Sequence, residues 1–188
     1  MSIAILDGTK KNDSFSKMLV ESLGVLDEAF EFLKLEDMTI KPCRNCGGCS
    51  YKTPGSCIVK DDTPLMMRRI VNAERFGILT YISFGGYASV TKKAMDKLVL
   101  MGLPNFVVNK GRLQHPTRYP KGNPECMAPN IVIAITDNNT EFEKQNFEKL
   151  VKSNELIMMT PFKLVFVEKN EAQESIHQKL IQVSKGVK

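Results

Sequence analysis

The chain has 188 residues, of which 43% are hydrophobic and 25% are charged, and its formal net charge is +5. This composition is typical of a globular protein and excludes an intrinsically disordered chain. The length suits one ordinary domain with one hydrophobic core, so we expect a single domain over residues 1–188. The basic residues are scattered among 21 acidic ones and form no nucleic-acid-binding motif, so we expect no nucleic-acid partner.

Neither a membrane span nor a secretory signal is visible in the sequence. No apolar run approaches the length that crosses a bilayer, and the N-terminus, MSIAILDGTKKND, has no basic stretch ahead of an apolar one. We therefore expect a cytoplasmic protein that does not bind membranes. In that reducing compartment the five cysteines need not form disulfides, and we expect Cys126 to be a small buried hydrophobic residue.

Five short apolar runs predict buried strands, and each is followed by a segment with helical spacing of apolar residues. The predicted strands are residues 3–6, 30–35, 76–83, 131–136 and 162–167. The predicted helices begin at Ser14, as an N-cap, and at Asp62-Thr63-Pro64, and the others span 89–100, 142–156 and 172–184. Alternation of this kind predicts an α/β fold with a doubly wound, five-stranded parallel sheet. Ligands of such sheets bind outside the carboxyl ends of the strands.

The loop after the first predicted strand, GTKKNDSFS at residues 8–16, is rich in hydroxyl groups and lysines. Its side chains Thr9, Lys11, Ser14 and Ser16 precede or open a helix, where backbone N–H groups and cations attract anions. The glycines of a Walker A or dinucleotide-binding loop are missing. The loop therefore indicates either a phosphate site or an ordinary helix start with solvated lysines.

A glycine pair, Gly85-Gly86, interrupts the chain after the third predicted strand. Glycine lets the backbone approach a flat ring closely, and it also serves turns that need a positive φ. Both interpretations stay open on the residues alone.

Residues 41–62 form an irregular loop in which Cys43, Cys46, Cys49 and Cys57 have the spacing C-x2-C-x2-C-x7-C. Tight runs of this kind are typical of [4Fe–4S] ligation. A structural zinc site is a second interpretation, and free thiols or a redox-active disulfide are a third. A second irregular segment, residues 102–129, contains five prolines and three glycines, and we expect a loop or short hairpin there.

The loop at residues 8–16 resembles the phosphate loop of the NADPH-dependent FMN reductase family, G-S-x-R-x-x-S-x-[ST], with Thr9 for Ser and Lys11 for Arg. The stretch FGGYAS, followed by KKAMDK, resembles the family's flavin loop, in which a proline stands where this chain has Tyr81.

The cysteine loop resembles that of iron–sulfur flavoproteins, whose last cysteine follows a shorter gap. It is more similar still to a related group of flavodoxin-like oxidoreductases with the pattern P-C-x-x-C-x-x-C-x-x-K-T-P-G-x-C. The same group has an H-x-x-R-Y stretch, which is similar to His115–Tyr119 here.

These resemblances imply a flavodoxin-like sheet with the strand order 2-1-3-4-5 and a bound FMN. They place the FMN phosphate on Thr9, Lys11, Ser14 and Ser16, and the flavin ring against Tyr81, Ser83, Phe84, Gly85 and Gly86. The flavin then carries the redox chemistry, so no side chain is expected to be catalytic.

The implied function is an FMN-binding oxidoreductase that transfers electrons from NAD(P)H to a small-molecule or protein acceptor, with or without a [4Fe–4S] cluster on the four cysteines. A ferredoxin-linked electron carrier without nicotinamide turnover is one alternative. A metal-binding or regulatory module without flavin is another. The resemblance also implies a homodimer or homotetramer.

Overall fold

The structure is a computed structural model that describes residues 2–26, 28–117 and 129–185. Arg118, Tyr119 and Cys126, on which expectations were placed above, lie outside the described residues.

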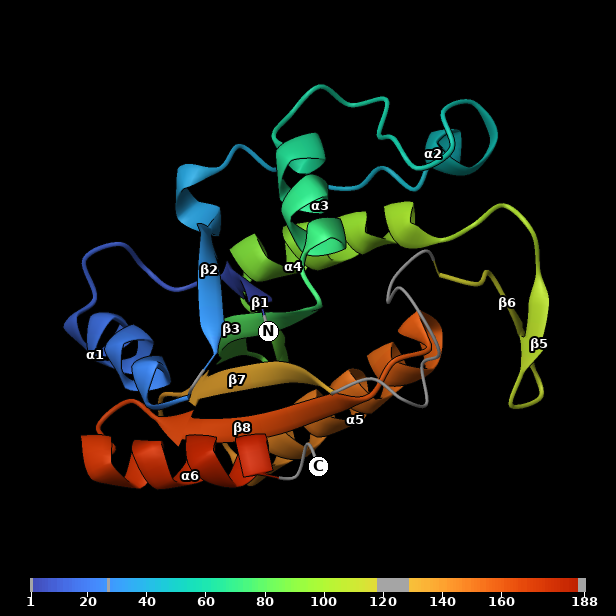
Figure 1. Ribbon diagram of the computed structural model, residues 1–188. Coiled ribbons are helices and arrows are strands. Elements are labelled where there is room, and N and C mark those ends of the chain that lie inside the picture. The colour runs from blue at the N-terminus through green and yellow to red at the C-terminus, as the bar shows by residue number, and fades with distance from the viewer. Residues whose placement is uncertain (1, 27, 118–128, 186–188) are drawn as a thin grey trace.

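A parallel sheet forms the centre of the molecule (Figure 1). Its strands are β1 (Ser2–Asp7), β2 (Ala29–Lys34), β3 (Arg75–Ser83), β7 (Asn130–Thr136) and β8 (Phe162–Glu168). They are hydrogen-bonded in the order β2-β1-β3-β7-β8, and every neighbouring pair is parallel. The five predicted strands and the order 2-1-3-4-5 are therefore confirmed. A two-residue strand, β4 (Gly86–Tyr87), pairs antiparallel with the end of β3.

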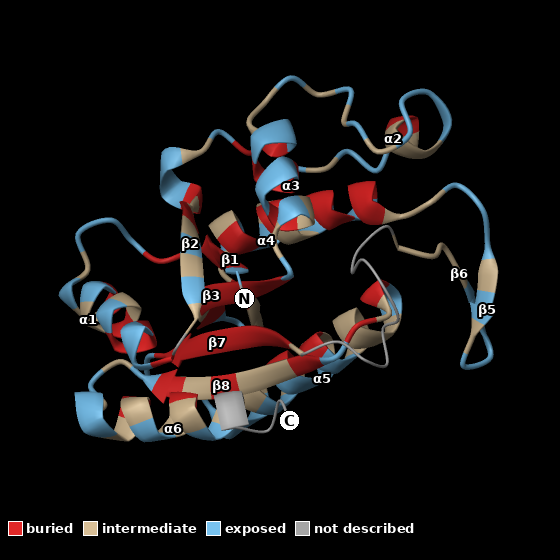
Figure 2. Cartoon of the chain, viewed as in Figure 1, coloured by how far each residue is buried: buried red, intermediate tan, exposed pale blue. Residues whose placement is uncertain are grey.

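Helices cover both faces of the sheet, which is why its central strands are apolar without alternation. One face packs against α1 (Ser14–Ser22) and α6 (Gln173–Lys185) through residues such as Leu19 and Ile176. The other packs against α3 (Thr63–Asn72), α4 (Ser89–Lys97) and α5 (Glu141–Met158) through Met66, Ala94 and Phe147. Figure 2 shows β1, β3 and β7 buried almost throughout.

The helix starts agree with the sequence to within one residue. α3 begins as expected, with Asp62 as N-cap and Pro64 in the first turn. α1 differs, because Asp13 is the N-cap and Ser14 is already the first helical residue. Both residue types are favourable N-caps, so the composition of the loop could not decide between them. The change matters because it places a carboxylate at the N-terminus of α1.

Two segments leave the compact α/β body. The cysteine loop, residues 41–62, passes over the α3 side and contains a single helical turn, α2 (Gly48–Tyr51) (Figure 1). The segment predicted to be a loop or hairpin contains β5 (Val107–Asn109) and β6 (Arg112–Gln114), which form an antiparallel hairpin that projects from the body. No helix in the described part of the chain is long and apolar enough to cross a bilayer.

Candidate functional site

An open pocket of about 790 Å³ lies at the carboxyl ends of β1, β3 and β7. This is the point at which the strand order reverses between β1 and β3, where open α/β sheets bind their ligands. Its walls come from the loop after β1, the end of β3, the start of α4, and the loops after β7 and β8. The lining residues are Gly8, Thr9, Lys10, Asn12, Asp13, Glu36, Tyr81, Ile82, Ser83, Ala88, Ser89, Val90, Asp137 and Lys169.

The base of the first loop is fixed by a largely buried ion pair. Lys34 Nζ lies 3.1 Å from Asp7 Oδ2 and donates a 2.7 Å hydrogen bond to Thr9 Oγ1. The backbone N–H and the hydroxyl of Thr9 both donate to Asp7 Oδ1, at 2.9 and 2.6 Å. Thr9 therefore lies in the pocket wall, with its hydroxyl already engaged within the protein.

Lys11, expected to face a phosphate, is paired elsewhere. Its Nζ lies 2.6 Å from Asp37 Oδ1, and its backbone N–H donates to Glu36 Oε2 at 2.5 Å. The hydrogen bond and the charge of Asp37 raise the pKa of Lys11. Lys11 is not among the residues that line the pocket, whereas its neighbour Lys10 is. Ser14, exposed in the first turn of α1, also lies outside the lining.

Asp13, Ser16 and Tyr81 form a hydrogen-bonded group that joins α1 to β3. Ser16 Oγ donates to Asp13 Oδ2 at 2.6 Å, and the Tyr81 hydroxyl donates to the same oxygen. Partial burial would raise the pKa of Asp13, but the hydrogen bonds from Ser16 and Tyr81 bring it below its usual value. Burial, together with the hydrogen bond to Asp13, raises the pKa of Tyr81 to about 12. Ser16, predicted to hold a phosphate, is thus buried against a carboxylate.

The loop after β3 reaches the pocket only at its beginning. Tyr81 and Ser83 line it, whereas Phe84, Gly85 and Gly86 do not. Phe84 is 98% exposed and has a φ of 50°. Gly85 has a φ of 74°, and a Cβ at that position would lie 3.1 Å from Asn146 Cβ on α5. The Gly85 backbone therefore approaches a helix of the same chain.

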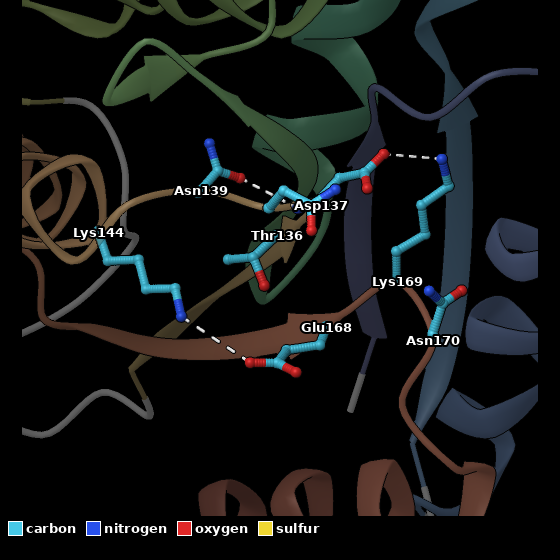
Figure 3. Close-up of a pocket in the computed structure, with 8 residues that line it drawn as sticks. Thr136, Asp137, Asn139, Lys144, Glu168, Lys169 and Asn170 are labelled. Carbon is cyan, nitrogen blue, oxygen red and sulfur yellow. Dashed lines mark hydrogen bonds and ion pairs between the residues drawn. The ribbon is translucent and has the colours of Figure 1, made fainter.

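Sequence reasoning did not single out Asp137 and Lys169, which follow β7 and β8. They form an ion pair of 2.7 Å and line both the main pocket and a smaller polar one of about 150 Å³ (Figure 3). Since carboxyl ends of parallel strands share an edge, their position directly after two predicted strands was the available signal. The start of α4 and Glu36 also line the pocket. Their place there follows only from how the folded elements pack together.

The four cysteines of the motif are free thiols in the structure. Cys46 is exposed, and the other three are partly buried. Cys57 accepts a 3.3 Å hydrogen bond from Lys97 Nζ and lines a separate pocket of about 310 Å³ beside α3. Within the described residues, no three His, Cys, Asp or Glu side chains lie close enough together to hold a metal ion. The loop therefore does not present a ready set of cluster ligands.

Sheet order, helical layers and a pocket at the switch point together define a flavodoxin-like α/β protein. No protein-family model matches the chain. Among curated proteins it is similar to an iron–sulfur flavoprotein of Archaeoglobus fulgidus, at 26% identity over 56% of this chain and 53% of that protein. An iron–sulfur flavoprotein of Methanocaldococcus jannaschii is 27% identical over 52% of this chain and 51% of that protein. These matches confirm the resemblance indicated by the cysteine loop, although the chain spans only about half the length of the curated relatives it matches.

Solved structures support the fold over the whole chain. An NAD(P)H:quinone oxidoreductase from Methanothermobacter marburgensis has a TM-score of 0.66 at 12% identity, covering 99% of this chain and 94% of that one. An azoreductase from Bacillus anthracis has a TM-score of 0.61 at 10% identity, covering 99% and 97%. At such identities the likeness establishes the flavodoxin-like fold, as predicted.

Proposed function

We propose that this protein is an FMN-binding oxidoreductase that passes electrons from NAD(P)H to a small-molecule or protein acceptor. The observation that carries the proposal is the pocket at the switch point, which has loops resembling the family's phosphate and flavin loops in its walls. Its volume of about 790 Å³ is within the range of cofactor sites. The names of the structural neighbours, a quinone oxidoreductase and an azoreductase, describe the same class of chemistry.

The residues that line the pocket would hold FMN in three ways. The end of β3, Tyr81–Ser83, would lie along the edge of the ring, and the start of α4 at Ala88–Val90 would close the site beside it. The loop from Gly8 to Asp13 would face the ribityl and phosphate end. Bound FMN supplies the hydride and electron transfer, while the protein supplies position and electrostatics. No side chain in the lining needs to act as a nucleophile.

The test is to purify the full chain without oxygen, assay flavin, and follow NADH and NADPH oxidation with a quinone acceptor. We expect about one FMN per chain and steady oxidation of either NADH or NADPH. Flavin retention without nicotinamide turnover would favour the alternative of a ferredoxin-linked carrier. A chain that never retains flavin would contradict the proposal and favour a metal-binding or regulatory module on the same fold.

A [4Fe–4S] cluster on Cys43, Cys46, Cys49 and Cys57 is a separate proposal, favoured by the cysteine spacing and by the names of the curated relatives. Because Lys97 engages Cys57 and the thiols are not gathered, the loop would have to rearrange to bind it. Iron and sulfide assays on the same anaerobic sample decide the question. About four iron per chain would support a cluster, and flavin without iron would contradict it.

Assembly and location also stay predictions. We expect a homodimer or homotetramer, because the resemblance implies subunit association. We also expect the protein to be located in the cytoplasm. Light scattering of the purified chain measures the first, and fractionation of cells measures the second. A monomer would contradict the expected assembly without affecting the proposal for the pocket.

A further inference from the structure

The N-terminus of α1 already carries an anion that belongs to the protein itself. Asp13 is the N-cap, and its Oδ2 accepts hydrogen bonds from Ser16 Oγ at 2.6 Å and from the Tyr81 hydroxyl. Unpaired N–H groups and the helix dipole make such a terminus attractive to negative charge. An ionised carboxylate therefore lies in the region in which the phosphate of a flavin would be expected, and it already accepts the hydroxyl hydrogen bonds of Ser16 and Tyr81.

Tyr81 limits how far this carboxylate can move away. The tyrosine belongs to β3, where it is paired in register with Ile135 of β7 in the centre of the sheet. Its hydroxyl reaches across to the start of α1, so the carboxylate is joined to two different elements. Both Asp13 and Tyr81 line the pocket. A ligand that displaces the carboxylate must break both hydrogen bonds.

Three of the nearby lysines are matched by carboxylates of the protein. Lys11 pairs with Asp37 at 2.6 Å, Lys34 with Asp7 at 3.1 Å, and Lys169 with Asp137 at 2.7 Å. A phosphate group at this end of the pocket would meet the carboxylates of Asp13 and Asp137 as well as the ammonium groups of Lys10 and Lys169, because all four residues line it. Like charges in a partly buried site repel more strongly than in bulk water.

We propose that Asp13, positioned by Tyr81, is a specificity-determining residue that disfavours the phosphate group of a flavin at the N-terminus of α1. Resting on the proposed function, this inference deepens it: ring and ribityl contacts supply most of the flavin affinity, and FMN gains little over riboflavin. Ser16 then serves to hold Asp13 and does not contact phosphate.

The experiment compares the affinities of the flavin-stripped full chain for FMN and for riboflavin, measured by quenching of flavin fluorescence. The variant Asp13→Asn keeps the size of the side chain, and asparagine is also a favourable N-cap residue, so α1 is expected to form. It removes the charge that opposes phosphate. We expect FMN to bind about tenfold more tightly, which corresponds to about 1.4 kcal/mol, while riboflavin binding is unchanged. Tyr81→Phe, which frees the carboxylate, is expected to shift the ratio in the same direction by a smaller factor.

Glu21→Gln is the matched control, because it removes one negative charge from an exposed position on the same helix. It is expected to leave the FMN-to-riboflavin ratio as in the unchanged chain. An unchanged ratio in Asp13→Asn, or a loss of FMN affinity, would overturn the inference while leaving flavin binding intact. If neither flavin binds to any of these proteins, the proposed function itself fails and the inference fails with it.

Discussion

Lys97 and Asp61 form an ion pair that is closed off from solvent, with Nζ 3.5 Å from Oδ2 and side-chain exposures of 1% and 0%. Asp61 also accepts hydrogen bonds from the backbone N–H groups of Lys41 and Thr63, each at 3.0 Å. Lys97 is the last residue of α4 and donates to Cys57 as well. The pair thus fastens both ends of the cysteine loop to a helix that contributes to the pocket.

Lys97→Met is therefore expected to destabilise the protein strongly. Removing one partner of a buried pair leaves the other charge uncompensated, which costs about 3–5 kcal/mol. Lys92→Met on the same helix breaks only the exposed pair with Asp96, for which about 0.3–0.5 kcal/mol is expected. Urea unfolding of the unchanged chain and of the two variants measures both changes in the free energy of unfolding. Equal effects of the two substitutions would contradict the role given to Lys97.

A second prediction concerns Gly85, whose φ of 74° and close approach to α5 are separate constraints. Gly111, in the β5–β6 hairpin, has the same φ, and a Cβ there would meet no atom within 4 Å. Gly111→Ala therefore measures the cost of the positive φ alone, an expected loss of about 1–2 kcal/mol in the free energy of unfolding. Gly85→Ala is expected to cost more, because its Cβ would lie 3.1 Å from Asn146 Cβ. Thermal unfolding of both variants gives the comparison, and a smaller loss in Gly85→Ala would contradict the packing argument.

A third prediction concerns Gly8, where the loop after β1 passes α4. A Cβ at this position would lie 1.9 Å from Thr91 Oγ1, a buried hydroxyl that is hydrogen-bonded to Thr80. We expect Gly8→Ala to destabilise the chain by about 1–3 kcal/mol, as overpacking does. Gly24→Ala, with no atom within 4 Å of its Cβ, is the control and is expected to be nearly neutral.

The double variant Gly8→Ala/Thr91→Ala separates a steric clash from a general loss of the loop. Since it removes the hydroxyl that the new methyl meets, its loss of stability should be smaller than the sum of the two single losses. Strict additivity of the two losses in urea unfolding would contradict the contact.

The sheet was predictable because its central strands are buried on both faces, so an apolar run such as Ile3–Leu6 carries its own signal. The partners of polar side chains gave no such signal. Lys11 is matched by Asp37, 26 residues away, and Tyr81 reaches Asp13 across 68 residues. These choices depend on where the folded elements meet. Residue types therefore marked loops that line the pocket, but could not show which side chains were already engaged within the chain.

Tyr81 also offers a direct spectroscopic check of its contact with Asp13. Burial and the hydrogen bond to the carboxylate raise its pKa to about 12, and burial raises the pKa of Tyr87 to about 12 as well. Because the folded state binds the Tyr81 proton more tightly than the unfolded state, this contribution to stability is present below pH 10, the ordinary tyrosine value, and is lost as the pH rises toward 12.

Ultraviolet absorbance of phenolate, followed as the pH is raised, measures this titration. We expect Tyr81→Phe to remove one tyrosine from the transition near pH 12 and Tyr87→Phe to remove another. In Asp13→Asn, the Tyr81 step is expected to move to lower pH, because the carboxylate that opposes the phenolate is gone. The Tyr87 step, whose hydroxyl accepts a hydrogen bond from Asn154 at 2.8 Å, serves as the internal reference and should stay in place. If Asp13→Asn left both steps unmoved, the hydrogen bond between Asp13 and Tyr81 would not exist in solution.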